Sequence, residues 1–296
     1  MAFFLQLVFA GLALGCNYAL IALGFTIIFK ASQAINFAQG QFLLVGAYVV
    51  SVAMFVWHLN FFIALLIGMA VTAAIGVLFE RIVLRRMIGR PPFLLIMVTI
   101  GLNVLLLTGV EIVLGAQFPR SPAPFDFVGG FNVGGVELGH NNLAAIGATI
   151  LICALLYGFF RYTRYGLAMR ATALDQEVAL AMGIKISTVY ALAWAMAGAI
   201  ATIGGIFLTA NNPTFDTSLG NTALVAFPAI ILGGLDSILG AVVGGVVIGV
   251  IYVLAQAYSP TSLGTGFYTI VPFLVMILVL LVRPYGLFGT RKVERV

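Results

Sequence analysis

The sequence predicts an all-α, polytopic integral membrane protein with about eight or nine membrane-spanning helices, one of them discontinuous. Of its 296 residues, 62% are hydrophobic and only 8% are charged, whereas about 25% of the residues of an ordinary soluble domain are charged. The charges are spaced so that apolar stretches of about 20 residues, enough for a membrane-spanning helix, lie between them. We therefore expect one membrane domain over residues 1–296.

The expected spans follow the uncharged stretches in chain order. The first, at residues 5–29, lacks the basic n-region of a cleavable signal peptide, so we expect it to be retained. Seven more are predicted, at residues 36–57, 61–84, 93–115, 142–160, 188–210, 237–257 and 267–282. The stretch at 220–235 is different, because Pro228 and the Gly233-Gly234 pair interrupt a regular helix. A complete crossing there gives nine spans and a re-entrant one gives eight; we prefer a discontinuous crossing.

The basic residues predict the orientation, since Lys and Arg concentrate in cytoplasmic loops. They cluster at residues 81–90, 161–185 and 283–295. The connection at residues 116–141 holds a single basic residue, Arg120, and is expected to be extracytoplasmic. Residues 161–187 are expected to form a cytoplasmic loop. The net charge of +5 then reflects these loops, and no nucleic-acid partner is expected.

Enzyme signals are poor. The two histidines, His58 and His140, lie at the outer end of a predicted span and in the outer loop, and Cys16 and Cys153 lack a metal-ligand spacing. We therefore predict no catalytic residue and no metal site. The chain has no G-x-x-x-x-G-K-[ST] sequence, so we expect no cofactor in this chain and any ATP to be bound by partner subunits.

Acidic residues within the predicted spans are few. Glu111 lies near the outer end of its span, where snorkelling or pairing with a loop group is favoured. Asp236 follows a Gly pair and is interpreted as a cap for the helix that begins at Ile238. A proton-coupled carrier usually needs more acidic groups, so the secondary-transporter reading is disfavoured.

Neutral polar residues in the spans are candidates for the translocation path. Asn36 and Gln39 share a helix face, and Thr99 and Asn103 form a second polar face in the fourth span. Such side chains can hydrogen-bond a polar solute without the cost of a buried charge. They can equally cap a helix or hold neighbouring helices together, and the residues alone favour that alternative.

Residues 166–184 predict a helix of about four turns in the second basic loop, ending at Gly183. An apolar stripe follows helical spacing at Leu167, Ala171, Leu174, Val178 and Met182. Arg170, Asp175 and Glu177 lie off it. A helix of this kind rests on the membrane surface or docks its stripe in the groove of a partner. The residues alone favour surface packing.

Glycines with small-xxx-small spacing occur in the span at 237–257, at Gly240, Gly244, Gly245 and Gly249. This spacing lets helix backbones approach closely. It is interpreted as packing within the chain, with a subunit interface as the alternative.

Several motifs resemble those of bacterial importer permeases. Glu177-Val178-Ala179 followed by Gly183 is similar to the E-A-A-x-x-x-G loop of ABC importer permeases, without the later I-x-L-P part. More specific are Y-A-L-I-A-L-G at 18–24, I-N-F-A-Q-G at 35–40, R-A at 170–171 with A-M-G-I at 181–184, and R-P-Y-G-L-F-G at 283–289. Together they resemble the high-affinity branched-chain amino acid permeases of the LivH type over nearly the whole chain. Gln39 stands where the N-F-A-H-G form has His.

This resemblance implies a multi-pass inner-membrane permease subunit of an ABC importer that translocates branched-chain or other small neutral amino acids by ATP-driven alternating access. It implies four partners: a related, LivM-like permease subunit, two cytoplasmic ATPase subunits and an extracytoplasmic solute-binding protein. The helix within residues 161–187 would then be the coupling helix. Its implied ATPase-coupling residues are Arg170, Asp175, Glu177, Ala179 and Gly183. A urea or short-chain amide permease, and a stand-alone secondary transporter or channel, are the alternatives.

Overall fold

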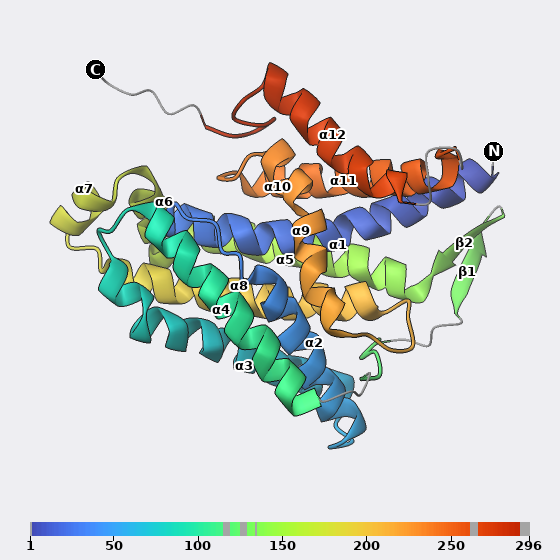
Figure 1. The fold of residues 1–296 in the computed structure, drawn as a ribbon, viewed down its shortest axis with the longest axis horizontal. Helices are drawn as coiled ribbons and strands as arrows, with labels where there is room; N and C mark the ends of the chain where they lie inside the picture. Colours follow the sequence, from blue (N-terminus) through green and yellow to red (C-terminus); the bar gives the residue numbers. More distant parts are fainter. Residues whose placement is uncertain (1, 115–118, 125–128, 134, 261–265, 291–296) are drawn as a thin grey trace.

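A computed structural model of the chain describes residues 2–114, 119–124, 129–133, 135–260 and 266–290. Figure 1 shows a helical bundle with one long helix in its middle and a small hairpin at one end. The hairpin pairs β1 (Gly130–Val133) with β2 (Val136–Gly139) in antiparallel register. The helices are α1 (Ala2–Ser32), α2 (Gln39–Phe55), α3 (Phe61–Ile82), η1 (Leu84–Met87), α4 (Pro92–Leu114), α5 (His140–Tyr162), α6 (Arg164–Leu174), α7 (Gln176–Ala181), α8 (Ile186–Thr209), η2 (Thr217–Asn221), α9 (Thr222–Val225), α10 (Phe227–Gly233), α11 (Ile238–Tyr258) and α12 (Phe267–Val282).

In the described part of the chain, six helices are long and apolar enough to cross a membrane: α1, α3, α4, α5, α8 and α11. Three shorter apolar helical stretches, Gln39–Phe55, Thr217–Gly233 and Phe267–Val282, coincide with the remaining predicted spans. The prediction of an all-α, polytopic membrane protein is therefore confirmed. The predicted total of nine spans requires that all three of the shorter stretches cross.

Helix α1 forms the centre of the bundle. It is mostly buried within the chain, as is α8, whereas α3, α4, α5 and α11 leave most of their surface uncovered, as lipid-facing helices do. α1 packs against α11, α8 and α5, and α8 packs against α2 and α3. An apolar helix that is buried on all sides belongs at the centre of a membrane bundle.

The glycines of α11 bring it close to its two neighbours. A Cβ atom built on Gly245 would lie 2.7 Å from Ala19 Cα in α1, and one on Gly249 would meet the backbone of Gly15. On the other side, Gly240 and Gly244 face the backbone of α10 at Gly233 and Ala229. In lipid, close backbone approach of this kind supplies the packing that holds helices together. The interpretation of these glycines as packing within the chain is confirmed.

The interrupted stretch runs from one end of the bundle to the other. At its start, Phe215 N–H donates to Pro119 O at 3.1 Å, beside the long outer connection. It continues through η2, α9 and α10. The C-cap residue of α10 is Gly234, whose φ of +105° is readily adopted only by glycine. At its far end, Asp236 lies against Thr290, which follows α12. This path matches the predicted discontinuous crossing.

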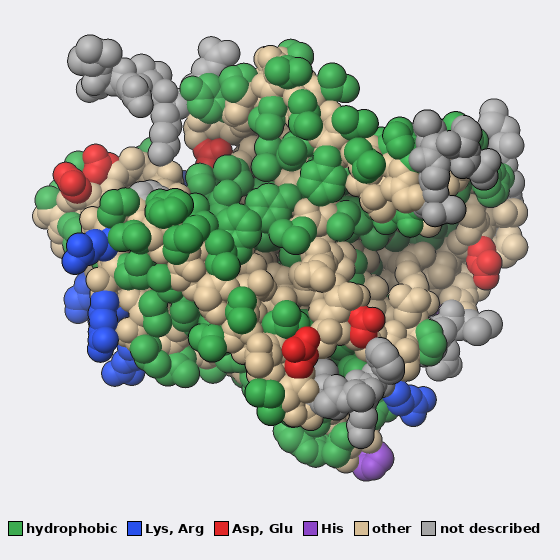
Figure 2. Space-filling model, in the orientation of Figure 1, with side chains coloured by type: hydrophobic (Ala, Val, Ile, Leu, Met, Phe, Trp, Pro, Cys, Tyr) green, Lys and Arg blue, Asp and Glu red, His purple; other side chains and the backbone are tan. Residues whose placement is uncertain are grey.

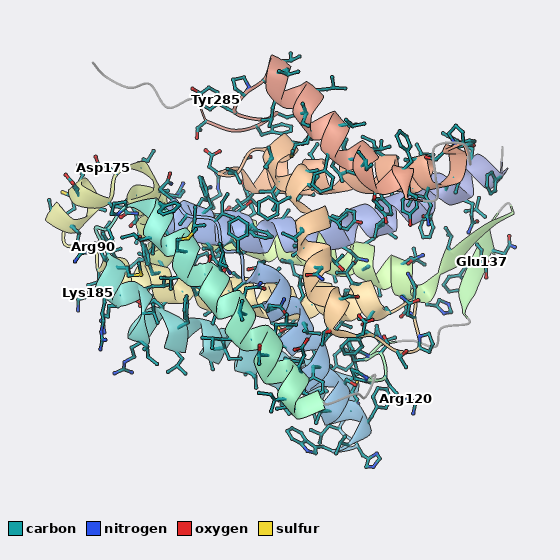
Figure 3. The ribbon with its side chains drawn as sticks, viewed as in Figure 1. Arg90, Arg120, Glu137, Asp175, Lys185 and Tyr285 are labelled. Atoms are coloured by element: carbon teal, nitrogen blue, oxygen red, sulfur yellow. The ribbon has the colours of Figure 1, made fainter. Side chains whose placement is uncertain are left out.

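Basic side chains gather at one end of the bundle, which we call the basic end (Figure 2). Figure 3 places Arg90 and Lys185 there, with Arg120 and Glu137 at the opposite end. Arg85 donates to Ser187 Oγ at 3.3 Å, so the first two basic clusters adjoin. The basic end is the expected cytoplasmic end. Of the predicted outer loop at 116–141, residues 116–118, 125–128 and 134 lie outside the described residues, as do Arg291, Lys292 and Arg295.

Candidate functional site

Three of the four predicted path residues lie together where the chain enters α2. Asn36 and Gln39 are fully buried, and Thr99 of α4 is 2% exposed. Asn36 Nδ2 donates to Gln39 Oε1 at 3.3 Å, and Gln39 Nε2 donates to Ala197 O of α8 at 3.3 Å. These bonds join the start of α2 to α8 deep within the bundle.

The same cluster fixes the non-helical segment that precedes α2. Phe37 N–H donates to Thr99 Oγ1 at 3.1 Å, and Ala38 N–H donates to Asn36 Oδ1 at 3.0 Å. Backbone groups that leave a helix at membrane depth must be satisfied by protein. In this conformation the side chains of Thr99 and Asn36 satisfy these backbone groups. The void beside them measures only about 10 Å³. Asn103 is half-buried one turn further along α4, and its side chain has no hydrogen-bond partner among the described residues.

Two buried polar features lie outside the predicted set. Thr72 Oγ1 of α3 and Thr202 Oγ1 of α8 are 2.8 Å apart, where Gly68 and Gly198 bring these helices together. Glu80, within α3, is 3% exposed, and its Oε1 has no hydrogen-bond partner in the described part of the chain. Sequence reasoning considered only Glu111 and Asp236 as acidic residues within spans and missed Glu80. Its place inside a 22-residue apolar helix was the available signal.

The predicted coupling helix is two helices, which corrects the prediction of one continuous helix at 166–184. Asp175 takes an extended conformation, with φ −156° and ψ 116°, and separates α6 from α7. Its Oδ1 accepts hydrogen bonds from the N–H groups of Glu177 at 2.9 Å and Val178 at 3.0 Å. Asp175 is thus the N-cap of α7, and satisfying these two donors offsets the helix break.

The end of α7 was predicted correctly. Gly183 has φ +83°, and no atom lies within 4 Å of a Cβ built on it. Gly183 N–H donates to Leu180 O at 2.9 Å, and Ile184 N–H donates to Ala179 O at 3.0 Å. This is a Schellman motif, in which a glycine in the left-handed conformation closes the helix.

The apolar stripe of α6 and α7 points away from the bundle. Leu174 is 89% exposed, Met182 78% and Val178 58%. We call these three side chains the coupling tip. Ala179, by contrast, is buried against the bundle. Exposed apolar side chains of this kind can dock in a partner's groove or rest on the membrane surface.

The tip is tied to the buried helices. Gln176 Nε2 donates to Ala31 O near the end of α1 at 3.4 Å and to the Tyr190 hydroxyl of α8 at 3.3 Å. Gln176 therefore connects α7 to α1 and α8, two helices that are mostly buried within the chain. Glu177 is exposed beside the tip, and Arg170 lines a cavity to which Leu174 of the tip also contributes.

Residues 7–280 match the sequence model of a family described as "Branched-chain amino acid transport system / permease component". The chain belongs to this permease family. No solved structure matches the chain.

Two relatives of this permease align with almost its whole length. It is 33% identical to the high-affinity branched-chain amino acid transport system permease protein LivH of Escherichia coli, covering 99% of this chain and 98% of the relative. It is 30% identical to BraD of Pseudomonas aeruginosa, a permease of the same description, with the same coverage. It is also 26% identical to the fructose import permease protein FruF of Bifidobacterium longum, over 79% of this chain and 66% of the relative.

The permease has a further structural device at its C-terminal motif. Residues 283–290, which we call the C-terminal latch, return from α12 to the end of α10. Leu287 N–H donates to Leu232 O at 2.8 Å, and Phe288 N–H donates to Gly233 O at 3.0 Å. The last carbonyls of a helix lack partners within the helix. The latch therefore satisfies the end of the discontinuous crossing.

Asp236 completes the latch. Thr290 N–H donates to Asp236 Oδ2 at 3.2 Å, and the Thr290 hydroxyl also bonds to this carboxylate. The prediction that Asp236 caps the helix at Ile238 is wrong. Ser237 is the N-cap, because its Oγ accepts from Gly240 N–H at 3.0 Å. A hydroxyl one residue nearer to the helix reaches the free N–H, which leaves the carboxylate to hold the tail.

Substituting Gly286 will show how far the latch stabilises the permease. We expect Gly286→Ala to lower the melting temperature more than Gly89→Ala, measured on the purified chain in detergent. Both glycines have positive φ, +75° and +80°, so both variants carry a similar backbone strain. Only at Gly286 would the new Cβ meet backbone, 2.6 Å from Ile231 O, whereas Gly89 faces open space. Equal shifts would show that the latch contributes no stability.

Proposed function

We propose that this chain is the membrane-spanning subunit of an ABC importer that translocates branched-chain or other small neutral amino acids by ATP-driven alternating access. The observation that carries the proposal is the coupling tip. Leu174, Val178 and Met182 are exposed at the basic end, on a hairpin fixed by an N-cap and a Schellman motif. The names of LivH and BraD support branched-chain amino acids as the solute class.

Four partners are proposed with it. Two cytoplasmic ATPase subunits bind ATP, since the sequence contains no phosphate-binding loop. One of them receives the coupling tip. A second, related permease subunit completes the translocation path, and an extracytoplasmic solute-binding protein delivers solute to the opposite end. The family to which the chain belongs supports ATPase and binding-protein partners.

The proposed mechanism runs through the helices that the tip contacts. ATP binding draws the ATPase subunits together and moves α7, and Gln176 passes the movement to α1 and α8. The path between the two permease subunits then opens on the other side of the membrane. ATP supplies the differential binding that a shift between two states requires. Asn36, Gln39, Thr99 and Asn103 stay candidates for contact with solute after such a movement.

Reconstitution tests the proposal. The tagged chain is co-expressed with candidate ATPase, second-permease and binding-protein genes, purified and placed in vesicles. We expect ATP-dependent uptake of radiolabelled leucine that requires all the partners. Unlabelled isoleucine, urea, acetamide and fructose are then compared as competitors, because FruF shows that relatives of this chain carry other solutes. Gradient-driven uptake by the chain alone would instead identify a stand-alone carrier.

A further inference from the structure

A cavity of about 440 Å³ opens at the basic end, between the ends of α1, α6, α10 and α12. Its walls are mostly apolar and include Phe29, Ile231, Leu235 and Leu280. Tyr285, labelled in Figure 3, belongs to its α12 side. The cavity does not include the buried cluster around Asn36, but Leu174 of the coupling tip and Tyr285 and Thr290 of the latch contribute to its lining.

Three charged side chains line this cavity: Lys30, Arg170 and Asp236. Among the described residues, neither Lys30 nor Arg170 has a carboxylate within ion-pair distance. Lys30 is half-buried and lies over the ring of Phe160, with Nζ 5.4 Å from the ring centre. Asp236 already accepts hydrogen bonds from Thr290. The cavity therefore presents two cations and one engaged carboxylate.

A half-buried cation such as Lys30 costs free energy unless an anion pairs with it, and the exposed Arg170 adds a second positive charge to the same cavity. Here the described walls carry a net positive charge even with Asp236 counted. The side chains next to the cavity on α12 face outward: Leu281 is 78% exposed and Val282 81%. In a membrane bundle, such an outward apolar face contacts lipid tails. A molecule with an anionic head and an apolar tail thus matches both the cations and the walls.

We propose that this cavity binds an anionic phospholipid, with its phosphate held by Lys30 and Arg170 and an acyl chain against Leu280 and Ile231. Basic pockets between membrane helices on the cytoplasmic side are suited to such head groups. The lipid would join α6 to α12 and to the end of the discontinuous crossing. It thereby stabilises the same region as the C-terminal latch. This inference does not depend on which solute the importer carries.

The test uses the purified full chain with phosphatidylglycerol and phosphatidylcholine in mixed micelles. We expect phosphatidylglycerol, and not phosphatidylcholine, to raise the melting temperature of the native chain and to be retained in native mass spectrometry. The double variant Lys30→Gln with Arg170→Gln should need roughly 30-fold more phosphatidylglycerol for half of the effect. The matched control removes two arginines of the same end that do not line the cavity, Arg161→Gln with Arg164→Gln, and should respond as the native chain does.

Three results would overturn the proposal. The first is an unchanged phosphatidylglycerol response in the Lys30 and Arg170 double variant. The second is an equal rise in melting temperature with inorganic phosphate alone, which would indicate a site for free anions. The third is loss of the retained lipid when ATPase or second permease subunits bind, which would assign the cavity to a protein partner. Lys30→Arg with Arg170→Lys keeps both charges and must restore the response, so a folding defect is distinguishable.

Discussion

Replacing Gly245 with leucine is expected to abolish accumulation of folded protein in the membrane. The Cβ of the new side chain would lie 2.6 Å from Ala19 N and 2.7 Å from Ala19 Cα, so α1 and α11 must separate. Since α1 is the central helix, its other packing surfaces are lost with this one. We expect a destabilisation of more than roughly 4 kcal/mol. Size-exclusion chromatography of a fluorescent fusion will measure it as loss of the monodisperse peak.

The matched control is Gly147→Leu in α5. Gly147 is exposed within a helix of similar apolar character, and a Cβ built there meets nothing within 4 Å. Leucine forms helix better than glycine and faces lipid at this position, so the peak should be unchanged or slightly larger. A normal peak for Gly245→Leu would show that the seam between α1 and α11 is not needed for folding.

Replacing Met182 with aspartate is expected to abolish solute-stimulated ATP hydrolysis by the assembled importer, while membrane insertion stays normal. Met182 is 78% exposed, so the folded chain loses little. In the proposed complex it is buried in a groove of an ATPase subunit, where a carboxylate cannot be hydrated. Central interface residues of this kind contribute at least about 2 kcal/mol, or roughly 30-fold in binding.

The control at the same position is Met182→Leu, which keeps the apolar contact and should retain most of the stimulation. Gly183→Trp and charge reversal at Arg170 and Glu177 are expected to uncouple hydrolysis from solute as well. Insertion is measured by the amount of chain in purified membranes, and stimulation by phosphate release with and without solute-loaded binding protein. Full stimulation in Met182→Asp would refute the assignment of the coupling tip.

The discontinuous crossing shows what could be predicted from sequence and what could not. Pro228 and the Gly233-Gly234 pair predicted the break, because these residues leave backbone groups without helical partners. The donors for the free carbonyls at the end of α10 could not be predicted. They are the N–H groups of Leu287 and Phe288, more than 50 residues later. Almost every residue has a backbone N–H, so the sequence does not indicate which N–H groups bond to the end of α10. Only the folded chain shows this.

The coupling segment shows the same limit at short range. Gly183 predicted its end, since a left-handed closing residue is nearly always glycine. The break at Asp175 was missed because the apolar stripe continues through it in helical register. Asp175 followed by Glu177 is an N-cap signal in itself, but a carboxylate also fits an exposed helix position. The hydrogen bonds of Gln176 to α1 and α8 accompany this break, and no local pattern records them.

The sequence by itself determined the class of the protein, its helical segments and the basic end, because burying charge or unpaired backbone in lipid is costly wherever it occurs along the chain. These are local properties that each segment carries alone. Tertiary structure decided which polar side chains are hydrogen-bonded within the chain and which line a cavity. Asn36 donates to Gln39, Gln39 donates to Ala197 O, and Thr99 accepts from Phe37 N–H, whereas Lys30 and Arg170 share a cavity with one carboxylate, that of Asp236. Only packing brings these side chains together, because their partners lie on helices far apart in the sequence.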